Sequence, residues 1–538
     1  MNNLEIYDTT LREGEQAAGA SFNIDDRVKV CKKLDDLGVD YIEVGWPFAS
    51  KETFESFKPC MNATKNAEVV AFGSTSIDKI VEDDGNLKSL IDCGASIACI
   101  FGKTHPEHVE KQLKITLQEN LKRITDSSAF LIKNNVKVFY DAEHYFDSFK
   151  LNKNYAIFTL ASALKGGAER LILCDTNGGT LPNEAESIVK ETKNRLENFG
   201  TRFELGLHFH DDSGLALANT LACLPYARQV QGTINGIGER VGNLNLSEFL
   251  PIYMKKMGNK RNTNLKLLKK INEDIFRIAG IDIPESRAFV GDTAFAHKGG
   301  VHTDATLKGL SYEHEIPEEF GNKRTILLNT LGGRACVTSV AKEFGYELNK
   351  TNPETISKIE SLFEELKSLE ERGYRMGAVK AEKYLLIEKY FGDLEEFCKI
   401  EEWEVNTKYM RGKERSTFKM NYELNGELFR KVETVDGGPV DAAYKTIKAA
   451  LKTQYQEIGN LKLKDFHVNI AKSRGEESSV RTIVYFNDGE EFETIGVDPN
   501  IIQSAVEALE KGFRYYLNRQ PKKVEIDLKM LKNNKMYG

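Results

Sequence analysis

Two histidines separated by one residue stand at the end of an apolar run, in the segment HFHDDSG. In a strand, His208 and His210 would point to the same face, because side chains alternate with a period of two. Two imidazoles side by side can ligate one divalent metal ion. A pair of packing or surface histidines would give the same pattern. On its own, the pair therefore leaves a metal site and a structural role open.

The segment TLREGEQ, close to the start of the chain, contains the charged groups that such a site needs. A carboxylate would complete a set of three metal ligands and leave positions open for substrate, and we expect Glu13 to supply it. Arg12 beside it could bind a substrate carboxylate or polarise a carbonyl group. We expect Asp8, at the end of the preceding apolar run, to buttress Arg12. A surface ion pair between Arg12 and Glu13 is the alternative.

A glycine-rich loop, GTINGIGERVGN, follows a later apolar run. Its glycines would allow the backbone to approach a ligand closely, and phosphate sites in barrels often use loops in this position. The spacing of the glycines differs from that of a dinucleotide-binding motif. We expect the loop to contact substrate through Asn235, Gly236, Gly238 and Glu239.

Two further segments contain candidate bases. Glu143 lies at the end of an apolar run in DAEHYFD, and His297 and His302 lie in HKGGVH. A histidine has the best-matched pKa for proton transfer near neutral pH. For His297 a structural role is the more common outcome.

The polar segments follow short apolar runs that alternate with amphipathic, helix-like segments. The eight runs are LEIYD, YIEVG, EVVAF, IACIF, VKVFY, RLILC, ELGLH and VQGTI. Their length and their β-branched and aromatic residues are typical of buried strands. The number of repeats predicts an α/β fold, a (β/α)₈ TIM barrel, with an open doubly wound sheet as the alternative. Barrel enzymes place their chemistry at the carboxyl ends of the strands, where these polar groups lie.

The rest of the chain predicts two more parts. We expect a metal-dependent catalytic barrel over residues 1–270, helical linker subdomains over 271–395, and an α+β regulatory domain over 396–538. The last part contains two βββα units in tandem, which indicates internal pseudo-symmetry. Their strands need a partner face, so we expect a homodimer.

The composition excludes several classes of protein. A net charge of -7 does not favour nucleic acid or an anionic membrane surface as a partner. No apolar stretch approaches the roughly 20 residues of a spanning helix, and the first strand-like run begins too early for a signal peptide. The eight cysteines form no CxxC motif. We expect buried thiols in the reducing cytoplasm.

The segments DTTLREGEQ, HFHDDSGLALAN and NGIGERVGN form a highly specific combination. With them, the chain resembles the acyl-CoA-dependent synthases that condense acetyl-CoA with a 2-oxo acid, among them 2-isopropylmalate, homocitrate and citramalate synthases. The resemblance covers nearly the whole chain. Segments such as AFGST, CDTNGGTLP and FAHKGGVH are most similar to the (R)-citramalate type. That type usually has aspartate where Glu13 stands.

The resemblance assigns a role to each matching residue that would contact substrate. Arg12 would polarise the 2-oxo group, and Thr176 would help to hold the carboxylate of the oxo acid. Glu143 is implied as a catalytic acid or base. His302 and Tyr312 match catalytic residues that the linker region delivers, usually from a partner subunit.

The resemblance also implies a divalent metal ion (zinc, manganese or magnesium) and acetyl-CoA as co-substrate. Glu13, His208 and His210 would be metal ligands, and Asn243 would lie close to the metal. The implied reaction condenses acetyl-CoA with pyruvate to give (R)-citramalate and CoA, an early step towards isoleucine. The implied regulator is an amino acid, isoleucine or leucine.

Three alternatives remain. The same chemistry on another 2-oxo acid would make the chain a 2-isopropylmalate or homocitrate synthase. A lyase of the same barrel superfamily uses a cysteine in the loop after the last strand, and GTINGIGERVGN contains none. A non-catalytic amino-acid sensor would not need Arg12, Glu13 and the two histidines.

Overall fold

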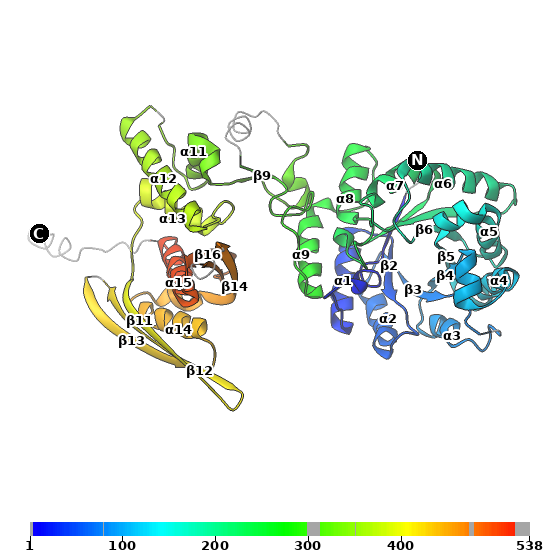
Figure 1. Ribbon diagram of the computed structural model, residues 1–538, viewed down its shortest axis with the longest axis horizontal. Helices are drawn as coiled ribbons and strands as arrows, with labels where there is room; N and C mark the ends of the chain where they lie inside the picture. The colour runs from blue at the N-terminus through cyan, green and yellow to red at the C-terminus, as the bar shows by residue number, and fades with distance from the viewer. Residues whose placement is uncertain are drawn as a thin grey trace, which may run out of the picture. The chain divides into compact units, whose positions relative to one another are not determined.

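The fold is that of a computed structural model of the 538-residue chain (Figure 1). The structure describes residues 4–78, 80–298, 313–349, 351–424, 426–472 and 478–521. The chain divides into two compact units, of which unit 1 is Met1–Phe295 with Glu315–Lys323, and unit 2 is Ala296–His314 with Arg324–Gly538. The division into three domains at residues 270 and 395 stays a prediction.

Unit 1 contains a closed barrel of eight parallel strands, surrounded by helices (Figure 1). The strands are β1 Glu5–Asp8, β2 Tyr41–Gly45, β3 Glu68–Ser74, β4 Ile97–Lys103, β5 Lys137–Glu143, β6 Arg170–Asp175, β7 Glu204–Phe209 and β8 Gln229–Gly232. The helices are α1 Ile24–Leu37, α2 Lys51–Ala63, α3 Gly85–Asp92, α4 Leu117–Lys133, α5 Tyr145–Lys165, α6 Pro182–Glu197, α7 Ala216–Cys223, α8 Leu246–Pro251 and α9 Leu268–Ala279. Strand β1 pairs with both β2 and β8, so the predicted barrel is confirmed and the open sheet is excluded.

Local sequence signals set the ends of the helices. Helix α1 begins at a capping box, in which the side chains of Asn23 and Asp26 each accept a hydrogen bond from the other's backbone N–H. It ends at Gly38, whose φ of 93° lies in the left-handed region that favours glycine. This turn feeds the chain directly into β2 and its inward-facing side chains.

Two apolar layers hold the barrel. The larger lies between the strands and the surrounding helices. The smaller fills the interior of the barrel and consists of Tyr7, Val70, Phe72, Ile97, Cys99, Phe139, Ile172 and Cys174. Because side chains alternate along a strand, Glu43 shares the inward face with Tyr41, and Asp141 shares it with Phe139. The carboxylates of Glu43 and Asp141 therefore lie next to aromatic side chains on the inward face of the barrel.

Unit 2 contains helices and two small three-stranded sheets, each of which is followed by a helix. A short pair of strands, β9 Ala296–His297 and β10 Thr325–Ile326, precedes α11 Gly333–Glu343, α12 Pro353–Arg372 and α13 Lys380–Phe391. The first βββα set is β11 Lys399–Met410, β12 Lys413–Leu424, β13 Glu427–Val435 and α14 Pro439–Leu451. The second is β14 Lys462–Lys472, β15 Ser479–Asn487, β16 Glu491–Asp498 and α15 Ile501–Asn518. The predicted tandem βββα units are confirmed.

No helix in the described ranges is long and apolar enough to span a lipid bilayer.

Candidate active site

The carboxyl ends of the eight strands enclose a cavity of about 440 Å³. Each strand, or the loop after it, contributes to the lining, as expected for a barrel of this kind. Seven of the residues predicted from the sequence line it: Arg12, Glu13, Glu143, Thr176, His208, His210 and Glu239.

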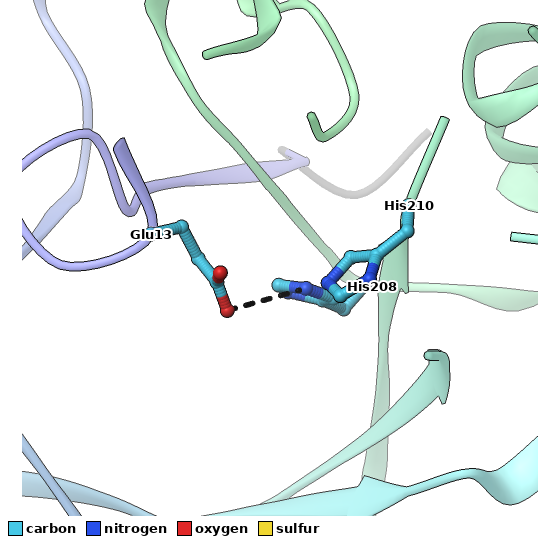
Figure 2. Close-up of side chains that lie close together, drawn as sticks. All are labelled: Glu13, His208 and His210. Carbon is cyan, nitrogen blue, oxygen red and sulfur yellow. Dashed lines mark ion pairs between the residues drawn. The ribbon is translucent and has the colours of Figure 1, made fainter. Parts of the chain in front are cut away.

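Glu13, His208 and His210 converge at one side of this cavity (Figure 2). One possible ligand atom from each lies within 4.8 Å of those of the other two. The Oε1 atom of Glu13 is 3.8 Å from Nε2 of His208, close enough for one ion to bridge them. Of the His, Cys, Asp and Glu side chains that the structure describes, only these three form such a group. The set suits a divalent ion that accepts nitrogen and oxygen ligands.

A different acceptor supports each imidazole. His208 Nδ1 lies 2.8 Å from the side-chain oxygen of Gln231. His210 Nδ1 lies 2.9 Å from the carbonyl oxygen of Thr176. A proton on Nδ1 leaves Nε2 free to ligate a metal ion. Arg240 Nη2 also lies 2.7 Å from His210 Nδ1, and a guanidinium can only donate, so the two contacts of His210 require opposite tautomers.

The charges of the three side chains suit ligation. Burial, together with the neighbouring His210, lowers the pKa of His208 to about 4. Burial also lowers the pKa of His210. For Glu13, burial raises the pKa, but Arg12 and the two histidines more than offset this and the pKa is lowered. Near neutral pH the site therefore presents neutral imidazoles and a carboxylate, the forms that bind metal ions.

The guanidinium of Arg12 is held from three sides. It forms short hydrogen bonds with the carboxylates of Glu13 and Glu43. It also stacks over the ring of Phe72, with its central carbon 3.8 Å from the ring centroid. Glu43, fully buried in the middle of β2, receives a further hydrogen bond from the hydroxyl of Tyr7. Arg12 is thus a fixed cation at the edge of the cavity.

The expectation that Asp8 buttresses Arg12 is wrong. The carboxylate of Asp8 instead accepts bonds from the backbone N–H and the hydroxyl of Thr10, at 2.8 and 2.9 Å. Burial raises the pKa of Asp8 to about 7. Glu15 turns away from Arg12 as well and binds Arg27 through both of its carboxylate oxygens. These residues shape the loop after β1 and leave Glu43 to hold Arg12.

Glu143 lines the cavity at the end of β5, which in the order of the strands lies across the barrel from β1. Its Oε2 atom is 2.6 Å from Nζ of Lys103, which ends β4. The hydroxyl of Thr176, directly after the next strand, β6, accepts a hydrogen bond from the backbone N–H of His144. A carboxylate beside an ammonium at the mouth of a cavity can take part in proton transfer.

The glycine-rich loop divides between two cavities. Glu239 lines the central one, whereas Asn235, Gly236 and Asn243 line a second cavity of about 130 Å³. Gly238 lines neither, and a Cβ atom there would lie 2.2 Å from Nδ2 of Asn243. The structure thus makes Gly238 a packing position against Asn243, and its predicted contact with substrate stays a prediction.

Asn243 has an unsatisfied side-chain oxygen and lies in a segment that is bridged to His210. Its backbone forms an isolated bridge with that of His210. Its Nδ2 atom donates to the carbonyl of Ile237 at 3.3 Å, while its buried Oδ1 atom has no hydrogen-bond partner among the described residues. A buried amide oxygen without a partner is costly, and a cation would satisfy it.

His297 lies in unit 2, where its Nε2 atom is 2.9 Å from a carboxylate oxygen of Glu313. Glu313 also binds Arg324 through both of its oxygens. This contact is consistent with the structural role expected for His297. The candidate catalytic residues His302 and Tyr312 lie outside the described residues.

Four polar residues of this region were not among the sequence predictions: Glu43, Lys103, Asp141 and Gln231. Each stands inside or at the end of a run that otherwise reads as a buried strand. A polar residue within an apolar run could have indicated these positions from the sequence. A charged or amide side chain within a strand covered on both faces needs a partner inside the barrel.

Comparisons with known proteins agree with this architecture. Residues 3–275 match the HMGL-like family model, which is about half of the chain. The chain belongs to the HMGL-like family. Beyond the HMGL-like region, residues 289–373 match a homocitrate synthase post-HMGL domain-like model, and residues 379–517 match the LeuA allosteric (dimerisation) domain.

Full-length relatives of this HMGL-like chain include synthases of the type that the sequence motifs resemble. It is 39% identical over 521 residues to the (R)-citramalate synthase of Aquifex aeolicus, and the match covers 95% of this chain and 97% of the relative. It is 37% identical to the (R)-citramalate synthase of Sulfolobus acidocaldarius, over 96% of this chain and 97% of the relative. A 2-isopropylmalate synthase of Methanocaldococcus jannaschii is 30% identical, over 96% of this chain and 95% of the relative. The predicted resemblance is confirmed.

Proposed function

We propose that this HMGL-like enzyme is a citramalate synthase. It condenses acetyl-CoA with pyruvate and hydrolyses the resulting thioester, which gives (R)-citramalate and CoA. The observation that carries the proposal is the placement of Arg12 against the Glu13–His208–His210 group in the barrel cavity. The similarity to two (R)-citramalate synthases over nearly their whole length supports pyruvate as the oxo acid.

Glu13, His208 and His210 are the proposed ligands of a divalent metal ion. Two observations support this: the ligand atoms lie within 4.8 Å of one another, and the unsatisfied Oδ1 atom of Asn243 lies in the segment bridged to His210. Zinc, manganese and magnesium all fit a site of oxygen and nitrogen ligands. The bound metal would supply Lewis-acid polarisation of the 2-oxo group.

Arg12 is the proposed electrophilic catalyst. Negative charge develops on the former ketone oxygen as a carbon nucleophile attacks C2 of pyruvate. A guanidinium fixed by two carboxylates and a ring needs no reorganisation to stabilise that charge. Thr176 lines the same cavity and is the proposed partner of the substrate carboxylate.

Glu143 is the proposed base. It would take a proton from the methyl group of acetyl-CoA, and the carbanion that results attacks C2 of pyruvate. The ammonium group of Lys103, 2.6 Å away, orients the carboxylate. His302 and Tyr312, proposed from the resemblance, would add groups from the linker region, with His302 as the alternative base.

The aromatic side chains that line the cavity favour a small oxo acid as the substrate. The rings of Phe72 and Phe101 stack with centroids 5.5 Å apart, and Trp46 meets both edge-on. Three aromatic side chains in mutual contact form a stiff surface that leaves little freedom to accommodate a branched substituent. A methyl group, as in pyruvate, needs the least space.

The rest of the chain supports a regulated assembly. A LeuA allosteric (dimerisation) domain over residues 379–517 suggests that unit 2 pairs with a second copy and binds an effector. The proposed effector is isoleucine or leucine, with the predicted barrel, linker and regulatory domains as the functional parts. Titration of each amino acid into the full-length enzyme during turnover tests this. No inhibition by any branched-chain amino acid would contradict it.

The test of the proposed reaction is release of CoA thiol from acetyl-CoA with each of four acceptors: pyruvate, 2-oxobutyrate, 2-oxoisovalerate and 2-oxoglutarate. We expect the highest kcat/KM with pyruvate and near-complete loss in Arg12→Ala. A preference for 2-oxoisovalerate would favour the second candidate, 2-isopropylmalate synthase, which the relative of 30% identity supports.

A further inference from the structure

A line of buried polar side chains runs away from the metal ligands into the barrel interior. His208 on β7 is level with Gln231 on β8, and the two are partners in the parallel register of these strands. Gln231 is 1% exposed, and Asp141, across the barrel on β5, is 4% exposed. Buried amides and carboxylates are costly unless they are paired, so their contacts identify what they do.

The two contacts of the Gln231 side chain show which end of its amide is the NH₂ group and which is the oxygen. Its Nε2 atom lies 3.4 Å from Oδ1 of Asp141, and its Oε1 atom lies 2.8 Å from Nδ1 of His208. An ionised carboxylate can only accept hydrogen bonds, so the NH₂ end of the amide must face Asp141. The oxygen end then faces His208, and His208 must carry its proton on Nδ1.

We propose that Gln231 and Asp141 are positioning residues that fix His208 in the tautomer with a free Nε2 atom. That atom faces Glu13, 3.8 Å from its carboxylate oxygen. In the opposite orientation the amide would donate to Nδ1, place the proton on Nε2 and block ligation. The inference rests on the proposed function in one respect, namely that His208 is a metal ligand.

The same strand contains a matched control. Gln229 precedes Gln231 by two residues, so it points to the same face of β8, and it is fully buried. Both polar atoms of its side chain lack a hydrogen-bond partner among the described residues. Replacement of Gln229 removes an equally buried amide from β8 without touching the contact to His208.

The charge of Asp141 sets the conditions of the test. Burial and the nearby Glu43 raise the pKa of Asp141 to about 7, against the opposing influence of Arg12. Measurements at about pH 8 therefore keep the carboxylate ionised.

The experiment is calorimetric titration of Mn²⁺ and of Zn²⁺ into the metal-stripped full-length protein. We expect Gln231→Leu to weaken metal binding by about 10–100-fold, as loss of a partner behind a ligating histidine does. Gln229→Leu should stay within about twofold of the wild type, since the His208 contact is untouched. Thermal unfolding of each variant shows whether the fold is kept.

Exchanging the carboxylate at position 141 with the amide at position 231 distinguishes a positioning role of these two residues from a packing role. Asp141→Asn alone removes the carboxylate that orders the amide, and Gln231→Glu alone places two carboxylates side by side. In the double variant an amide at position 141 donates to a carboxylate at position 231, which still accepts from His208 Nδ1. We expect each single variant to bind metal about tenfold more weakly and the double variant to recover most of that loss.

The outcomes distinguish this inference from the proposed function. If His208→Ala abolishes metal binding while Gln231→Leu and Asp141→Asn bind as the wild type does, the positioning role is overturned and the metal site stands. If the double variant binds no better than the weaker single variant, the ordering of the amide is overturned. If the wild type binds neither metal, or His208→Ala binds as well as the wild type, the metal site itself fails, and the positioning role with it.

Discussion

The two sides of the barrel cavity differ in how their polar groups are held. On the proposed metal side, defined by Glu13, His208 and His210, each side chain has a close polar partner, which comes from the same loop for Glu13 and from a neighbouring strand or loop for the two histidines. On the proton-transfer side, defined by Lys103 and Glu143, one ion pair of 2.6 Å stands at the end of two adjacent strands with its carboxylate 24% exposed.

The difference in how the polar groups are held follows from the chemical role proposed for each side of the cavity. Ligands must keep one geometry and one protonation state throughout the reaction, and a buried support such as the Gln231 amide behind His208 favours this. A base must gain and lose a proton and approach a substrate that comes from solvent. Partial exposure and one flexible partner leave it that freedom.

The largest effect should come from the metal side. His208→Ala removes a ligand and its link to Gln231, and we expect a loss of kcat/KM of at least about 10⁴-fold, because metal-assisted polarisation and orientation are lost together. Metal content after dialysis and CoA release are the measurements. A variant that retains both metal and activity would remove the basis of the comparison.

Glu143→Gln should impair the proton-transfer side of the cavity and leave the metal side unchanged. Without a base, we expect kcat to fall by about 10²–10⁴-fold, while metal affinity stays within a few-fold of the wild type. Calorimetry and initial rates on the same preparation test this. Weaker metal binding in parallel with the lost activity would mean that the two sides are not independent, and unchanged kcat would shift the role of base to His302.

Phe101→Ala opens the aromatic surface that limits the substrate. The variant should improve kcat/KM for 2-oxobutyrate or 2-oxoisovalerate relative to pyruvate by about 10–100-fold, which corresponds to the discrimination that one or two methylene groups allow. Competition between the acceptors gives this ratio directly. An unchanged ratio would show that the substituent of the oxo acid lies elsewhere.

Lys103→Met tests the partner of Glu143 and should lower kcat by about tenfold, because the carboxylate loses its orienting contact but not its chemistry. Lys103→Arg is the matched control and should lose less, since it keeps the charge. Equal losses in the two variants would point to packing of the side chain.

The smallest effect concerns stability. An aspartate in the unfolded chain loses its proton near pH 4, whereas the pKa of buried Asp8 is about 7. Between these values the folded state binds more protons, so Asp8 lowers the free energy of unfolding as pH rises. Asp8→Asn removes the titrating carboxyl group and, with it, this decrease in the free energy of unfolding. The melting temperature of the variant relative to the wild type should therefore be higher at about pH 8 than at about pH 5, and an equal difference at both would contradict the assignment.

The strand ends could be predicted from the sequence because eight apolar runs alternate with amphipathic segments and each polar motif follows a run. The partners inside the barrel could not. In strands that are apolar on both faces, a single Glu43 or Gln231 does not reveal whether it points to the interior or to the helices. Asp8 was assigned to the wrong partner because nearness in sequence favoured Arg12, whereas the strand order places Glu43 of β2 against that arginine.

The most direct test of the account is the kcat/KM for CoA release with pyruvate and with 2-oxoisovalerate, measured for metal-loaded wild-type protein, metal-stripped protein and Arg12→Ala. We expect pyruvate to be preferred, and we expect activity to be lost on metal removal and restored by metal addition. We also expect near-complete loss of activity in Arg12→Ala. Activity in the metal-stripped protein and in Arg12→Ala equal to that of the wild type would contradict these expectations.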